Sequence, residues 1–155
     1  MENNRTQYDV IVVGLGMSAS SGNVMVVCRV RPLNKKEIER GAVCCLDFNP
    51  NKSGIAINMT SETSSAYGTN KFDFDRVFDM GSTQQSVYDY AARPIIDSVI
   101  EGFNGTIFAY GQTSSGKTHT MVGPDIGDVE IQGIIPRMVR TVFNRIENAS
   151  ENMEF

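Results

Sequence analysis

The chain has 155 residues, of which 41% are hydrophobic and 21% charged, and its formal net charge is −4 at pH 7. This length and composition predict one folded domain with a sizeable core and exclude an intrinsically disordered chain. The acidic balance argues against a nucleic-acid-binding module. The chain also has no apolar run approaching the ~20 residues of a membrane-spanning helix.

The cysteines and the N-terminus indicate a reducing compartment. The three cysteines are Cys28, Cys44 and Cys45. An odd number with an adjacent pair suits neither a disulfide framework nor a zinc site, so we expect reduced thiols in the core. The first ten residues are acidic and polar, unlike a secretory signal. We therefore expect a cytoplasmic protein without membrane insertion.

The first segment contains a glycine pattern typical of dinucleotide-binding turns. The pattern is formed by Gly14, Gly16 and Ala19. It follows an apolar run, Tyr8–Val13, that predicts a strand, but Ser18–Gly22 is poor in helix formers and a valine-rich segment begins at about Val24. No room remains for the helix that would hold a pyrophosphate, so the pattern does not predict a cofactor site. We expect residues 1–22 to be a leader or upstream extension outside the fold, and translation of the functional protein to begin at Met17.

Apolar segments further along the chain predict a series of short strands. The expected strands are Asn23–Val30, Ala42–Phe48, Gly54–Met59, Lys71–Phe78 and Thr106–Tyr110. Pro32 ends the first of them, and residues 33–41 form a charged loop or a short helical turn. Lys71–Phe78 alternates apolar and polar side chains, as a half-buried strand does.

Two helices are expected from apolar spacing and end signals. Ser82 and Gln85 predict a capping box for the first helix. Pro94 predicts a kink or a division into two helical pieces, and Gly102 predicts the end of the helix. The second helix is expected to begin near Pro136. Its predicted buried stripe comprises Ile135, Met138, Val139, Val142, Phe143 and Ile146.

The segment "GQTSSGKT" between the last strand and a helix matches G-x-x-x-x-G-K-[ST], the phosphate-binding loop. Its residues are Gly111, Gln112, Thr113, Ser114, Ser115, Gly116, Lys117 and Thr118. Gly111 and Gly116 permit backbone torsions that turn successive N–H groups toward phosphate oxygens. The motif assigns Lys117 to the β- and γ-phosphates and the hydroxyl of Thr118 to Mg²⁺. The motif therefore predicts a phosphate-bearing ligand with Mg²⁺.

This loop and its surroundings resemble the motor domain of kinesins. "GTIFAYGQTSSGKTHTM" resembles the phosphate loop of that family, and "VCRVRPLN", "FDFDRVF" and "QGIIPRMVRTVFNRI" resemble further family elements in family order. The similarity runs from about Asn23 to Phe155. The Thr-Ser-Ser form of the loop is most similar to conventional kinesin heavy chains, whereas Pro94 is commoner in other branches, which leaves the subfamily open.

The resemblance implies an α/β P-loop NTPase of the kinesin motor type, with an incomplete central β-sheet flanked by helices. Residues 23–155 would be the N-terminal part of a motor domain. Arg29, Arg31 and Pro32 match the family element that lines the adenine, and His119 matches the residue that packs on the other side of the base. Gly123–Gly133 corresponds to a solvent-exposed loop inserted in the second helix of the family, and we call it the insertion loop.

Phosphate binding alone does not give hydrolysis, which needs further groups. In kinesins these lie in an Asn-x-x-Ser-Ser-Arg and an Asp-Leu-Ala-Gly segment, and neither occurs in these 155 residues. We therefore expect no catalytic residue and no turnover within this chain. For the complete protein the resemblance implies a microtubule-stimulated ATPase in the cytoplasm and cytoskeleton. It would bind microtubules through regions mostly beyond this chain and form a homodimer through a downstream coiled coil.

Two other interpretations remain open on the sequence. One is a small-molecule kinase or another P-loop NTPase, which would not need the Arg29–Pro32 element 82 residues before Gly111 (111 − 29). The other is a truncated nucleotide-binding or interaction fragment without motor activity. Cargo, direction of movement and oligomeric state are not predicted by these residues.

Overall fold

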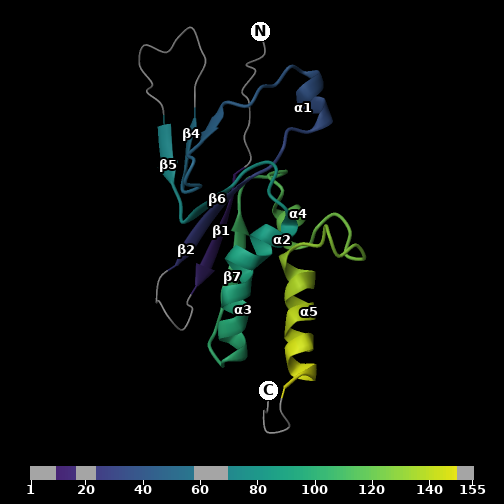
Figure 1. Ribbon diagram of the computed structural model, residues 1–155. Coiled ribbons are helices and arrows are strands. Elements are labelled where there is room, and N and C mark those ends of the chain that lie inside the picture. The colour runs from purple at the N-terminus through teal and green to yellow at the C-terminus, as the bar shows by residue number, and fades with distance from the viewer. Residues whose placement is uncertain (1–9, 17–23, 58–69, 150–155) are drawn as a thin grey trace.

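The computed structural model describes residues 10–16, 24–57 and 70–149, and for residues 10–16 the backbone alone. Within them the strands form two sheets (Figure 1). The larger sheet has the order β6-β2-β1-β7 and comprises β1 (Val10–Gly16), β2 (Met25–Val30), β6 (Arg76–Phe78) and β7 (Thr106–Tyr110). The smaller antiparallel sheet comprises β3 (Leu46–Phe48), β4 (Gly54–Ile57) and β5 (Asn70–Asp73).

The strand directions bring the two candidate binding segments to one edge of the larger sheet. β2 is parallel to β6, and β1 runs antiparallel to both β2 and β7. β2 and β7 therefore point the same way, on either side of β1. Arg31 follows the end of β2 and Gly111 follows the end of β7, so both segments begin at the same edge. The carboxyl ends of such strands are where ligands bind in open α/β sheets.

The first glycine pattern lies inside a strand. Gly14 is paired with Val26 on one side and Phe108 on the other, whereas the glycines of a dinucleotide-binding turn follow the strand. Ala19 lies outside the described residues. Val10–Gly16, part of the expected leader, thus pairs with the sheet on both sides. The remaining leader residues lie outside the described part of the chain, and the division at residue 22 stays a prediction.

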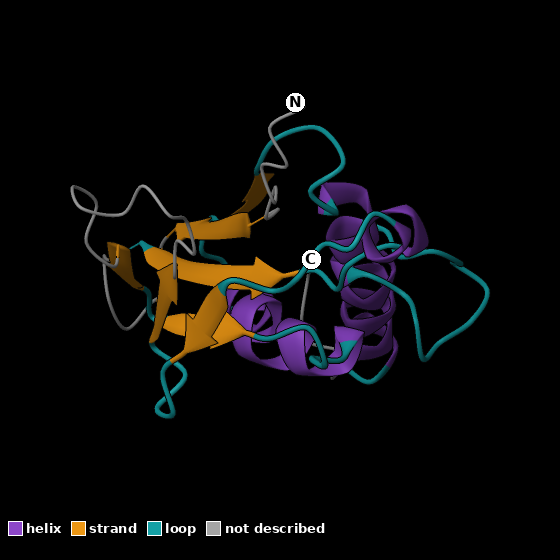
Figure 2. Ribbon diagram, turned by 90° about the horizontal axis from the view of Figure 1, so that it is seen from above, coloured by secondary structure: helices purple, strands orange, loops and turns teal. Residues whose placement is uncertain are grey.

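The helices gather on one side of the strands (Figure 2). They are α1 (Lys35–Glu39), α2 (Gln84–Val87), the π-helical turn η1 (Tyr88–Ala92), α3 (Arg93–Ile100), α4 (Lys117–Met121) and α5 (Ile134–Glu147). α2, η1, α3 and α5 form a core with β2 and β6 that comprises Val27, Phe78, Val87, Tyr88, Ala91, Ala92, Ile95, Ile96 and Ile134. A second cluster comprises Cys28, Val30, Leu46, Ile55 and Val77. Both faces of β2 are therefore covered, which explains its continuous apolar sequence.

Cysteine burial agrees only partly with the sequence. Cys28 is fully buried, and burial raises the pKa of its thiol to about 12, so it stays protonated at neutral pH. Cys44 is exposed, so the expectation of a core position is wrong for it. It follows a turn before β3 rather than lying within a strand.

The start and kink of the first long helix are determined by local side chains. Its N-cap is Thr83, whose Oγ1 accepts from the Ser86 N–H at 3.1 Å, so the predicted box of Ser82 and Gln85 is wrong by one position. The predicted interruption at Pro94 is confirmed, because η1 ends and α3 begins around it. Gly102 ends this helix with a φ of +95°, as predicted.

The predicted strand Lys71–Phe78 is two strands in different sheets, so that expectation is wrong. The break falls at Phe74 and Asp75. The Phe74 N–H donates to the Ser53 carbonyl at 2.7 Å, and the Asp75 carboxylate accepts from the Val26 N–H at 2.6 Å. These bonds redirect the chain from the small sheet to the large one. The alternating apolar pattern continues across the break because each half has its own core.

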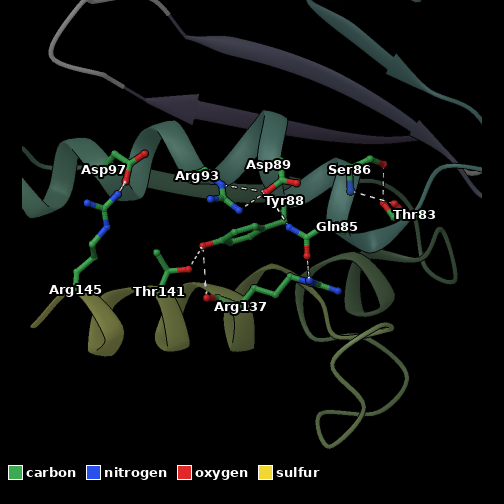
Figure 3. A network of polar contacts seen from close by, with 10 residues as sticks. All are labelled: Thr83, Gln85, Ser86, Tyr88, Asp89, Arg93, Asp97, Arg137, Thr141 and Arg145. Carbon is green, nitrogen blue, oxygen red and sulfur yellow. Dashed lines mark hydrogen bonds and ion pairs between the residues drawn. The ribbon is translucent and has the colours of Figure 1, made fainter. Parts of the chain in front are cut away.

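α5 packs beside η1 and α3, and a few polar contacts also join these helices (Figure 3). The Tyr88 hydroxyl lies 2.6 Å from Oγ1 of Thr141. Nη2 of Arg145 in α5 lies 3.1 Å from Oδ1 of Asp97 in α3. The predicted buried stripe of α5 is wrong in part. Its exposed members are Ile135, Val139, Phe143 and Ile146, while Met138 and Val142 pack against the core. Periodicity shows that a helix has an apolar face but not which part this chain covers.

Helix length also bears on membrane insertion. Among the described residues, none of the helices combines the length and apolarity needed to cross a bilayer.

A proline inside β1 tests whether this strand belongs to the folded domain. Val13 pairs with Val27 and Ala109, so Val13→Pro removes a hydrogen bond from a strand with neighbours on both sides. We expect the free energy of unfolding to fall by about 1–3 kcal/mol, the cost of leaving a buried backbone group without its hydrogen bond, as measured by urea denaturation. The control is Asn4→Pro, ahead of the strand. Equal stability of both variants and the unmodified chain would show that the leader lies outside the fold.

Candidate functional site

The candidate site is a cavity of about 550 Å³ at the carboxyl edge of the larger sheet. Its walls are the end of β2 with the segment after it, the segment before α2, and the end of the glycine loop with α4. Six of the residues expected from the sequence line it: Arg29, Arg31, Pro32, Ser114, Gly116 and His119. Elements far apart in sequence therefore converge on one space, as the strand directions require.

The glycine loop turns sharply between β7 and α4. Gly116 is the N-cap of α4 with a φ of +98°, a torsion that glycine adopts without steric cost. Ser114 takes a φ of +68°, which other residues rarely adopt, whereas Gly111 is not in this region. The expected role of Gly116 as a turn residue is thus met, and Ser114 rather than Gly111 provides the second left-handed torsion. This strain lies where the chain turns around the cavity.

Ser115 is the deepest residue of the loop. Its side chain is fully buried, and its hydroxyl has no hydrogen-bond partner among the described residues. Its backbone N–H donates to the Gln112 carbonyl at 3.2 Å. A buried hydroxyl without a partner costs free energy unless another group satisfies it.

Lys117 lies against its own loop. Its Nζ donates to the carbonyls of Gly111 and Gln112, both at 2.7 Å. The first two residues of the loop therefore bind the lysine cation. Thr118 follows in the first turn of α4, and its side chain is exposed. The lysine charge and the threonine hydroxyl are therefore both at the loop. Gln112 and Thr113 are exposed and do not line the cavity.

Arg29 is a buried charge at the end of β2, with 7% of its surface exposed. Its Nη1 donates to Oε1 of Gln84 at 2.7 Å and to Oγ1 of Thr120 at 3.0 Å. Its Nη2 donates to the carbonyl of Ser82 at 3.4 Å. Burial lowers the pKa of Arg29 to about 10, so the guanidinium remains charged at neutral pH. The cavity wall thus carries a fixed positive charge.

Arg31, in the segment after β2, is held by a residue of α1. Its guanidinium donates to both carboxylate oxygens of Glu37, at 2.8 and 2.6 Å. These bonds, together with the Asn34 N–H, lower the pKa of Glu37 to about 2. Asn34 is also the N-cap of α1, in a capping box with Glu37. The pairing fixes the segment after β2 along the cavity.

His119 lies on α4 and lines the cavity, and it is exposed. Desolvation and then the positive charge of Arg29 lower the pKa of the imidazole below its ordinary value of 6.5. The ring is therefore neutral at physiological pH. His119 and Pro32 both line the cavity. A neutral aromatic ring there can pack against a flat ligand without transferring a proton.

Sequence reasoning missed several residues of the site. Asn34, Asp79, Met80 and Ser82 line the cavity, and Gln84 supports Arg29 from behind. No motif marks them, because their place depends on how the segment before α2 packs against β2. Among the described residues, no cluster of His, Cys, Asp or Glu could bind a metal by itself.

Comparisons with known proteins agree with this geometry. The profile described as "Kinesin motor domain" matches residues 29–155. Kinesin-related protein 3 of Dictyostelium discoideum is 46% identical over 136 residues, 86% of this chain and 11% of that protein. The human Kinesin-1 heavy chain is 45% identical over 133 residues, 86% of this chain and 13% of that protein. The chain thus spans a small part of the length of these relatives.

A solved structure shows the same fold. It is described as the "Structure of a fast kinesin: Implications for ATPase mechanism and interactions with microtubules". The match has a TM-score of 0.72 and 38% identity, and covers 81% of this chain and 34% of that one. The fold is therefore that of a P-loop NTPase, with a partial sheet and the glycine loop at its edge. Since the profile covers residues 29–155, including that loop, the chain belongs to the kinesin motor domain family.

Proposed function

We propose that this chain is the ATP-binding part of a microtubule-based motor and that it holds Mg²⁺ and ATP in the cavity at the edge of the larger sheet. The observation that carries the proposal is the convergence of the glycine loop and the segment after β2 on one cavity. A family motif at only one of these two places would not identify the ligand. Together they provide for phosphates at one end and a base at the other.

The residues present fit this ligand. A cavity of about 550 Å³ is within the size range of nucleotide and cofactor pockets. The buried Ser115 hydroxyl lacks a protein partner in the described part of the chain, and the Lys117 cation lies at the same loop. Both features favour an anion at the loop. The backbone N–H groups around Gly116 would add further donors.

Each end of the cavity has a separate task. Lys117 would move from its carbonyl partners to phosphate oxygens, and the Thr118 hydroxyl would hold Mg²⁺. The bound metal supplies charge neutralisation for the β- and γ-phosphates. At the other end, Pro32 and the neutral His119 ring would pack against the base, and Arg29 would supply a fixed charge beside it.

The activity of the complete protein is proposed from its relatives. They are named kinesin heavy chains, and the description of the solved structure mentions an ATPase and microtubules. By extension we propose microtubule-stimulated ATP hydrolysis coupled to movement, a homodimer formed through a downstream coiled coil, and a cytoplasmic, cytoskeletal location. We also propose that residues 23–155 are the motor portion of this chain. Family membership does not favour the small-molecule kinase alternative.

Binding without turnover is proposed for the 155-residue chain. The segments that position the attacking water and report the γ-phosphate in kinesins do not occur in it. The site residues of the chain therefore bind and orient the nucleotide.

Lys117→Ala tests the phosphate end of the site. The substitution removes a charge-assisted contact worth ~1.5–3 kcal/mol, so affinity for a fluorescent ATP analogue with Mg²⁺ should fall roughly 10- to 100-fold. Fluorescence titration measures the change. Lys71→Ala, which removes the same charge from the small sheet, is the matched control and should bind like the unmodified chain. Equal binding by Lys117→Ala and the control would overturn the assignment.

The pH dependence of stability tests the environment of His119. Because its pKa is lowered in the folded chain, the unfolded chain binds this proton more tightly. The contribution of His119 to the free energy of unfolding should therefore be fully present above pH 6.5 and should be lost as the pH falls through that value. The stabilisation from Glu37, with a pKa of about 2, is lost only below 4.5 and lies outside this range.

The measurement compares the unmodified chain with His119→Phe, which keeps a ring but cannot titrate. Urea denaturation at about pH 5.5 and about pH 7.5 gives the two free energies of unfolding. The difference between them should be smaller in the variant. An identical difference in both proteins would show that His119 is as accessible to protons when folded as when unfolded.

A further inference from the structure

Gln84 lies behind the cavity wall and contacts three parts of the chain at once. Only 7% of its surface is exposed. Its Oε1 accepts from Nη1 of Arg29 at 2.7 Å. Its Nε2 donates to the carbonyl of His119 at 2.6 Å and to that of Ile131, in the insertion loop, at 3.2 Å.

These partners determine the orientation of the amide. A guanidinium is only a donor and a carbonyl only an acceptor, so the oxygen of Gln84 must face Arg29 and the nitrogen must face the two carbonyls. The opposite orientation would place donors against donors and acceptors against acceptors. No other uncharged side chain of this length can satisfy both sides. The residue is therefore matched to this place rather than merely tolerated there.

The insertion loop is itself held firmly, so a contact with it is a fixed anchor. Its base is closed by two glycines packed against backbone: a Cβ on Gly123 would lie 2.4 Å from the Ile131 carbonyl. The buried Arg137 donates from Nη2 to the carbonyls of Val129 at 2.7 Å and Glu130 at 3.1 Å, and from Nε to that of Gln132 at 2.9 Å. The exposed side chains of the loop thus surround a fixed main chain.

We propose that Gln84 is a positioning residue that sets the base end of the cavity, by holding Arg29 and the main chain at His119 to the insertion loop. The inference rests on the proposed nucleotide site. Gln84 is not among the residues that line the cavity. It acts through Arg29 and His119, which do line it, so its effect should fall on the base and not on the phosphates.

The first experiment separates the two ends of the site. Gln84→Met keeps the length and volume of the side chain but removes both kinds of hydrogen bond. Affinity of the 155-residue chain is measured by calorimetry for ATP and for inorganic tripolyphosphate, each with Mg²⁺. We expect ATP affinity to fall by about tenfold, the effect of losing a hydrogen bond to a charged group, and tripolyphosphate affinity to stay within about twofold. Lys71→Met, which places the same side chain on the exposed strand β5 of the small sheet, is the control and should bind both ligands like the unmodified chain.

A second variant separates the two sides of the amide. Gln84→Glu can still accept from Arg29 but cannot donate to the carbonyls of His119 and Ile131. Amide hydrogen exchange of the insertion loop is measured with and without ATP. In the unmodified chain we expect ATP to slow exchange in this loop, and in Gln84→Glu we expect that protection to be lost while ATP still binds.

The outcomes distinguish this inference from the proposed function. If the unmodified chain binds neither ATP nor tripolyphosphate, the proposed function fails. If it binds both and Gln84→Met binds ATP as tightly as the control, the inference on Gln84 is wrong and the proposed function stands. Should Gln84→Met lose tripolyphosphate as well, Gln84→Glu decides: loop protection equal to that of the unmodified chain overturns the inference, and its loss supports it.

Discussion

A charged guanidinium can be buried at the end of a strand only when its donors are paired, because an unpaired buried ion costs several kcal/mol. Arg29 meets this constraint with partners from α2, α4 and the segment before α2. The ion therefore joins the second strand to the helix that follows the glycine loop. The hydrogen bonds of Arg29 therefore contribute both to the packing of these elements and to the cavity wall.

The sheet places the rest of the site. β2 and β7 point the same way on either side of β1, so the segment after β2 and the glycine loop leave the sheet at one edge. The loop then bends through the left-handed torsions of Ser114 and Gly116. Local strain, a buried hydroxyl and a cation held by two carbonyls are tolerated together at this edge, as is common where a protein binds an anion. The direction of the strands thus determines where the cavity lies.

Sequence reasoning found what local chemistry determines and missed what packing determines. The glycine loop, the interruption at Pro94 and the end at Gly102 each follow from the torsions of one or two residues. The observed N-cap, Thr83, lies one residue after the predicted Ser82. Both residues carry a suitable hydroxyl, and the local backbone direction determines which of them caps the helix. Gln84 had no motif, since its partners come from three distant segments. For α5, likewise, the apolar spacing predicted a buried stripe but not which of its residues the rest of the chain covers.

The central claim is that phosphates lie at the glycine loop and the base between His119 and the segment after β2. A crystal structure of the chain with Mg²⁺ and a non-hydrolysable ATP analogue tests it most directly. We expect phosphate oxygens within hydrogen-bond distance of Nζ of Lys117 and of the backbone N–H groups around Gly116, with the base beside Pro32. An analogue bound elsewhere, or a Lys117 side chain still held by its two carbonyls beside a bound nucleotide, would contradict it.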